Sequence, residues 1–125
     1  MFVLDSSVLI EVIERHSRTS KILDVLQNSP LITTSICIHE VLTGARSKRQ
    51  VFRFEQVFSR AQVLNHDQQA ARIGAQIEQE LDRKGLKLHI IDIMIAAICI
   101  VHDAELITLD QSFKRIEGLK VRIIK

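Results

Sequence analysis

Hydrophobic residues along this chain come alternately in short unbroken runs and at the spacing of an amphipathic helix. The short runs predict strands over 2–4, 31–34, 106–109 and 121–124, and a weaker edge strand over 63–64. The helical spacing predicts helices over 6–13, 19–27, 35–44, 51–58, 67–85 and 93–101. Because strands that alternate with helices usually pair in parallel, the pattern predicts an α/β sandwich.

Polar residues mark the expected helix starts. Ser6 or Ser7 is placed to cap the first helix, and Ser35 is placed to cap the third. Glu11 and Glu14 occupy positions of the first helix that are expected to face water.

Length and composition fit one domain over residues 1–125, with 46% hydrophobic residues and a net charge of +2. The longest apolar run, 93–101, is far shorter than the roughly 20 residues of a membrane span. Asp5 interrupts the first apolar stretch, so no targeting segment is predicted and a cytoplasmic protein is expected. Cys37 and Cys99 lie in apolar surroundings without CxxC spacing and are predicted to be reduced core residues, although a disulfide between them stays open.

Several familiar catalytic motifs are missing from the chain. It has no GxGxxG, GxxxxGK[ST], GxSxG or HExxH pattern, so no nucleotide cofactor is predicted. The five histidines show no ligand-like pairing, which gives a zinc site little support. All the aromatic residues are phenylalanines, at 4% of the chain, which argues against a base-stacking platform.

Four acidic residues in apolar settings remain as candidates for chemistry. Asp5 and Asp110 each follow an apolar strand, and in an open α/β sheet both would lie at the carboxyl edge, where ligands bind. Asp92 heads the most apolar helix, and Glu40 lies on a short helix with apolar neighbours. Converging carboxylates repel each other and are costly to bury, and a divalent cation removes both problems. Hard oxygen ligands suit Mg²⁺ or Mn²⁺.

Each acid also has a simpler interpretation. Asp5, Asp92 and Asp110 are good helix caps, and Glu40 fits a solvated helix position. Capping would explain any one of them alone. The set of four is more than capping requires and favours a metal site.

Four blocks of the chain, taken in order, resemble the PIN domain family, and within it the VapC-type toxins of toxin–antitoxin pairs. The first block is FVLDSSVLI around Asp5, and the second is SICIHEVLTG around Glu40. The third is IDIMIAA around Asp92, and the fourth is LITLDQSF, which contains Asp110. The resemblance covers the whole chain.

The resemblance implies a three-layer α/β/α fold with a central, mainly parallel twisted sheet, and a metal-dependent endoribonuclease. It assigns Mg²⁺ or Mn²⁺ and the catalytic role to Asp5, Glu40, Asp92 and Asp110. From phosphodiester chemistry, one of these carboxylates is expected to act also as general base. Ser6 and Thr108 match positions of small polar residues that support the family's site. Two departures are Ile91, where the family often has Asn, and Ser6, where Thr or Asn is common.

The same resemblance implies an RNA substrate, a small antitoxin partner and a homodimer. Phosphate contacts are predicted for two basic stretches near the acids, and the alternative for each stretch is a solvated helix face. The residues concerned are Arg46, Lys48, Arg49 and Arg53 in the first stretch, and Arg83, Lys84 and Lys87 in the second. Apolar residues of the early helices would serve a protein interface or the core: Val8, Val12, Ile22 and Val25.

Two other classes of function compete with the nuclease. A PIN-like fold without activity would serve as an RNA- or protein-binding module, although the presence of all four acids argues against it. A receiver-type signalling domain needs an additional acidic pair beside the first strand, and this chain has only Asp5 there.

Overall fold

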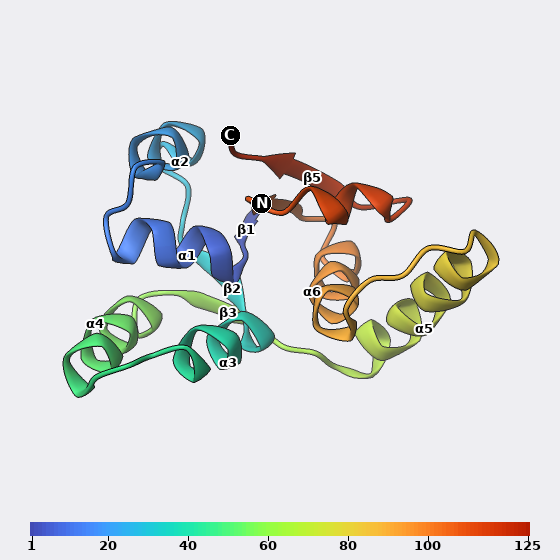
Figure 1. Ribbon diagram of the computed structural model, residues 1–125, viewed down its shortest axis with the longest axis horizontal. Coiled ribbons are helices and arrows are strands. Elements are labelled where there is room, and N and C mark those ends of the chain that lie inside the picture. The colour runs from blue at the N-terminus through green and yellow to red at the C-terminus, as the bar shows by residue number, and fades with distance from the viewer.

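The computed structural model describes residues 1–125 as five strands, six α-helices and one 3₁₀ helix. In chain order these are β1 (Phe2–Leu4), α1 (Ser6–Ile13), α2 (Thr19–Leu26), β2 (Ile32–Thr34), α3 (Ser35–Thr43), α4 (Lys48–Phe58), β3 (Gln62–Leu64), α5 (Gln68–Arg83), α6 (Ile90–Val101), β4 (Glu105–Thr108), η1 (Gln111–Arg115) and β5 (Lys120–Ile123). Figure 1 shows α1, α3 and α4 on one side of the strands, and α5 and α6 on the other. The expected layered α/β fold is confirmed.

All strand pairs are parallel, as predicted, but they form two separate ladders. One ladder has the order β1-β4-β5, and the other joins β2 to β3, the weak edge candidate. The two ladders meet where β2 lies beside β1 and the Thr33 hydroxyl donates to the Leu4 carbonyl at 2.7 Å. Because the strands are parallel, the residues that follow β1, β2 and β4 lie at the same edge of the strands.

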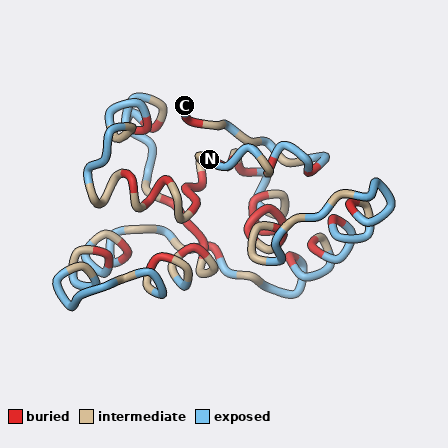
Figure 2. The backbone as a smooth tube through the Cα atoms, viewed as in Figure 1, coloured by how far each residue is buried: buried red, intermediate tan, exposed pale blue.

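One hydrophobic cluster fills the space between the layers. Its 27 buried residues come from the strands and from the inward faces of the helices, as the buried segments in Figure 2 show. Helix α6 contributes the most continuous buried stretch, which explains why its sequence is apolar on every side. Cys37 and Cys99 lie in this core as free, buried thiols, as predicted, and burial raises the pKa of Cys37 to about 12.

Three predicted details of the helices are wrong. Asp5, not Ser6 or Ser7, caps α1, which confirms the simpler interpretation of Asp5. Thr34, not Ser35, caps α3, because in each case the side chain of the residue just before the helix accepts the amide three residues further on. Glu11 does not face water: it is only 7% exposed and pairs with Arg18 at 2.9 Å. This pair joins α1 to the start of α2, a contact that helical spacing alone does not reveal.

No helix in the structure combines the length and the apolar character needed to cross a bilayer.

Candidate metal centre and nucleic-acid interface

Asp5 lies at the junction between β1 and α1, and its carboxylate is the most buried of the four acids, with 4% of the residue exposed. Oδ1 accepts hydrogen bonds from the Ser7 hydroxyl at 2.6 Å and from the Val8 amide at 3.1 Å. Oδ2 accepts one from the Thr108 hydroxyl at the end of β4. Burial raises the pKa of Asp5, while the donated hydrogen bonds act in the opposite direction. The carboxylate is therefore held in one orientation.

Glu40 lies on α3, which Thr34 caps through the Cys37 amide at 3.0 Å. The Ser6 hydroxyl donates to Glu40 Oε1 at 2.9 Å, so the first turn of α1 contacts α3. This contact leaves Oε2 of Glu40 free for another ligand.

Asp92 lies in the first turn of α6, where the helix dipole favours a negative charge. The pKa of Asp92 is nevertheless raised to about 6, first by burial and then by the carboxylates of Asp110, Glu40 and Asp5. His89 opposes this effect and is the residue that caps the helix, so the capping interpretation of Asp92 is wrong. The charges of Asp110, Glu40 and Asp5 therefore all act on the carboxylate of Asp92.

Asp110 follows β4 and is exposed. It caps the short helix η1 by accepting the Ser112 amide at 2.9 Å, as its simpler interpretation predicted. Its own amide donates to the Thr108 hydroxyl at 3.0 Å. Thr108 therefore contacts the side chain of the first acid and the backbone of the fourth.

The chemistry of the four acids fits a hard divalent cation. None of them takes part in any ion pair of the structure, although six of the eleven other acids have an Arg or Lys partner. Their oxygens are the ligands that Mg²⁺ and Mn²⁺ prefer. The site is not preassembled, since no three Asp, Glu, His or Cys side chains lie together as a formed metal site. The donor types and the uncompensated charge fit the ion, and its binding would require the side chains to draw together.

The basic residues differ in how available they are. Arg46, Lys48 and Arg49 are exposed and unpaired, and they follow directly after the helix that carries Glu40. Lys84 is held by Glu80 at 3.5 Å and by Glu117 at 3.2 Å. Arg53 also has a partner, Glu14, at 2.9 Å, and this pair lowers the pKa of Glu14.

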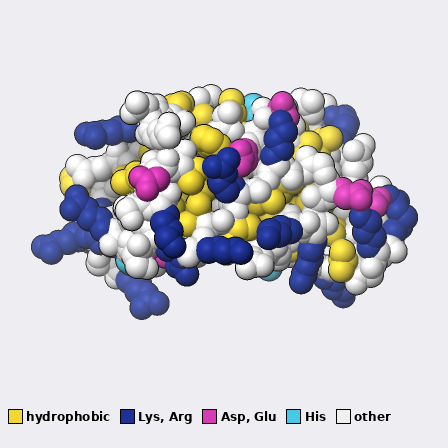
Figure 3. All heavy atoms as spheres, turned by 90° about the horizontal axis from the view of Figure 1, so that it is seen from above, with side chains coloured by type: hydrophobic (Ala, Val, Ile, Leu, Met, Phe, Trp, Pro, Cys, Tyr) yellow, Lys and Arg dark blue, Asp and Glu magenta, His cyan; other side chains and the backbone are white.

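The face that carries β5 is not a uniform basic surface. Figure 3 shows Lys and Arg side chains spread over it, with acidic side chains beside several of them. Lys120 pairs with Asp103, and Arg122 pairs with Glu105, each at 2.8 Å. The unpaired stretch at 46–49 is therefore the better candidate for phosphate contacts.

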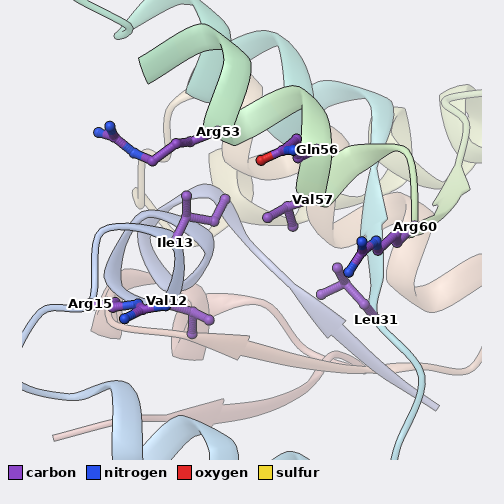
Figure 4. Close-up of a pocket in the computed structure, with 8 residues that line it drawn as sticks. All are labelled: Val12, Ile13, Arg15, Leu31, Arg53, Gln56, Val57 and Arg60. Atoms are coloured by element: carbon purple, nitrogen blue, oxygen red, sulfur yellow. The ribbon is translucent and has the colours of Figure 1, made fainter. Parts of the chain in front are cut away.

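A cavity of about 480 Å³ lies between α1 and α4, away from the acids. Val12 and Ile13 of α1 face Gln56 and Val57 of α4 across it (Figure 4). Leu31 closes one end, and guanidinium groups stand around the apolar lining: Arg15, Arg53 and Arg60. None of the four main cavities is lined by any of the four acids. A polymer with exposed phosphates can reach such a site without an enclosed pocket.

Sequence reasoning missed one residue of the site, Ser7. It contacts Asp5 directly and also accepts the Leu109 amide at 3.2 Å. The signal was present in the serine pair after Asp5, but a pattern cannot show that the Ser6 hydroxyl reaches α3 while the Ser7 hydroxyl reaches the end of β4.

The sequence model of the PIN domain family matches residues 2–119. The chain belongs to the PIN domain family. This PIN domain is 30% identical over 125 residues to the tRNA(fMet)-specific endonuclease VapC of Salmonella typhimurium, covering 96% of this chain and 95% of that protein.

The fold of this chain is similar to that of chains in solved toxin–antitoxin complexes. The PIN domain superposes with a TM-score of 0.87 on a chain of the DNA-bound VapBC complex of Salmonella typhimurium, at 29% identity, over 99% of this chain and 98% of that chain. A toxin–antitoxin complex from Klebsiella pneumoniae gives a TM-score of 0.81 at 24% identity, over 100% of this chain and 98% of that chain. The second likeness shows the fold alone.

Proposed function

We propose that this PIN domain is a metal-dependent endoribonuclease that hydrolyses RNA phosphodiester bonds, and that it is the toxin of a type II toxin–antitoxin pair. The observation that carries the proposal is a partly buried Asp92 that feels the charges of Asp110, Glu40 and Asp5: burial first, and then these three carboxylates, raise its pKa to about 6. None of the four acids forms an ion pair with Arg or Lys. The likeness to an endonuclease over nearly the whole chain supports the same activity.

In this proposal Asp5, Glu40, Asp92 and Asp110 hold Mg²⁺ or Mn²⁺. The bound ion would lower the pKa of water and offset charge on the phosphorus. Asp5 offers a carboxylate already fixed by three donors, whereas no protein donor holds the carboxylate of Asp92. Ser6 and Thr108 hold Glu40 and Asp5 in place.

The test is cleavage of a mixed RNA pool with Mg²⁺, with Mn²⁺ and with EDTA, using the wild-type protein beside Asp92→Asn. We expect cutting that requires the metal and is lost in the variant. Absence of cutting together with absence of Mn²⁺ binding would instead indicate a PIN domain that only binds RNA or protein.

The exposed cations Arg46, Lys48 and Arg49 are proposed to contact RNA phosphates. Replacing all three with Ala should weaken RNA binding and lower the slope of log affinity against log salt by about 2, since each single-strand phosphate contact contributes about 0.7. Binding is measured in EDTA on the uncleaving Asp92→Asn background. Lys84→Ala is the matched control, because Lys84 is already paired with two acids and is expected to contribute less. An unchanged salt slope in the triple variant would contradict the contact.

The antitoxin partner is proposed to occupy the cavity between α1 and α4. Its lining of Val12, Ile13 and Val57 suits the apolar side of an amphipathic helix, and Arg15 and Arg60 at its edge suit acidic residues flanking that side. Arg53 already pairs with Glu14, so it contributes less free charge.

A homodimer and a cytoplasmic location stay predictions.

Reversing the charge at the cavity tests this partner. Arg15→Glu and Arg60→Glu are each expected to weaken binding of the proposed antitoxin by at least ~10-fold, about 1.4 kcal/mol. Binding is measured by calorimetry with purified components. Arg72→Glu, on the exposed face of α5, is the control and should bind as the wild type does. Equal weakening in all three variants would indicate a long-range charge effect instead of contact at the cavity.

A further inference from the structure

The hydroxyl of Ser7 joins two parts of the site that are far apart in the sequence. Ser7 is the second residue of α1, and its Oγ donates to Asp5 Oδ1 at 2.6 Å. The same oxygen accepts the backbone amide of Leu109, the residue after β4, at 3.2 Å. One side chain therefore bonds the first acid and the backbone that leads into Asp110.

Thr108 makes the same kind of link on the other side of the Asp5 carboxylate. Its hydroxyl donates to Asp5 Oδ2 and accepts the Asp110 amide at 3.0 Å. Each hydroxyl has a single proton and donates it to Asp5, so its oxygen can only accept from the backbone amide on its other side. Two hydroxyls thus connect one carboxylate to two successive amides, those of residues 109 and 110.

Helix capping does not account for Ser7. The cap of α1 is Asp5, which accepts the Val8 amide, so the Ser7 hydroxyl is not needed to satisfy an end of the helix. Alanine is also a better helix former than serine, so helix propensity would favour losing the hydroxyl. What the hydroxyl provides is a connection between α1 and the end of β4.

We propose that Ser7 is a positioning residue that sets the distance and orientation of Asp5 relative to the backbone carrying Asp110. The proposal rests on the proposed function, because it concerns the ligands of the proposed metal site. Loss of the hydroxyl would leave Oδ1 of Asp5 with only the Val8 amide as donor and would remove the hydrogen bond between α1 and the Leu109 amide. Residues that orient metal ligands in this way typically change affinity by 10- to 100-fold when they are removed.

The experiment compares the wild type with Ser7→Ala, Ser7→Thr and Ser20→Ala. Ser20 is an exposed serine of α2 and serves as the matched control. Two readouts are used on metal-free protein: Mn²⁺ affinity by calorimetry, and hydrogen exchange of the Leu109 amide. Ser7→Ala is expected to weaken Mn²⁺ binding at least ~10-fold, and to accelerate exchange at Leu109. Ser7→Thr, which keeps the hydroxyl, should restore both values toward the wild type, and Ser20→Ala should change neither.

The outcomes separate this proposal from the proposed function. If the wild type binds Mn²⁺ and Ser7→Ala binds it equally well, the role of Ser7 is overturned while the metal site stands. If the wild type binds no Mn²⁺, both proposals are overturned. Ser7→Cys, which keeps the size of the side chain but donates weakly, is the second variant: it should behave like Ser7→Ala, and wild-type affinity in it would also overturn the proposal.

Discussion

Asp92→Asn is expected to abolish RNA cleavage and, at the same time, to stabilise the metal-free protein at neutral pH. The wild-type carboxylate lies partly buried among the charges of Asp110, Glu40 and Asp5, with no Arg or Lys partner. The amide keeps the shape of the side chain and removes the repelling charge. It also removes an anionic ligand from the proposed metal site, so activity and stability should change in opposite directions.

The direction of the pH dependence follows from the raised pKa of Asp92. That pKa moves from its ordinary value of 3.8 to about 6 on folding. Because the folded protein binds this proton more tightly than the unfolded chain, protonated Asp92 stabilises the folded state. This contribution is fully present below pH 3.8 and is lost as the pH rises through about 6. A shift of this size corresponds to about 3 kcal/mol for a fully buried group. Because Asp92 is only partly buried, solvent screening reduces the expected gain for Asn to about 1 kcal/mol.

Urea unfolding in EDTA at pH 4 and at pH 7.5 measures this effect. The variant should be more stable than the wild type at pH 7.5, and the difference should disappear at pH 4, where the wild-type carboxyl is largely protonated. Added Mn²⁺ should stabilise the wild type and not the variant. Asp82→Asn, an exposed acid of α5, is the control. A destabilised Asp92→Asn, or one that still cleaves RNA, would contradict the assignment.

Thr108→Val is expected to be the most destabilising single change at the site. Thr108 is fully buried, and its hydroxyl both donates to Asp5 and accepts the Asp110 amide. Valine has nearly the same shape, so packing is preserved while a buried carboxylate loses a donor and an amide loses its acceptor. Hydrogen bonds to charged groups contribute about 1.5–3 kcal/mol, so a loss of about 2–3 kcal/mol is expected.

Chemical denaturation and RNA cleavage measure the two consequences of Thr108→Val. Cleavage should fall by about 10- to 100-fold under conditions in which the variant remains folded. Thr108→Ser keeps the hydroxyl and should recover most of the activity. Thr43→Val, where an exposed hydroxyl bonds its own helix at His39, should change stability much less. Equal losses in Thr108→Val and Thr43→Val would show that the contact with Asp5 has no special role.

The sequence alone predicted the order of strands and helices, because hydrophobic spacing depends only on which face of each element is buried. It also predicted that acids follow β1 and β4, and hence that Asp5 and Asp110 share one edge of a parallel sheet. The buried thiols of Cys37 and Cys99 followed from their apolar neighbours in the same way. Each of these conclusions uses information that lies within a few residues of the position concerned.

The tertiary structure decided which polar groups meet across the fold. Glu11 is buried because Arg18 turns back onto it, and Lys84 is neutralised by Glu117, whereas spacing predicted a solvated acid and a free cation. Ser7 and Thr108 each bond a group about a hundred positions away in the chain. Such contacts depend on the directions in which two folded elements present their side chains, and no local pattern of hydrophobic and polar residues contains those directions.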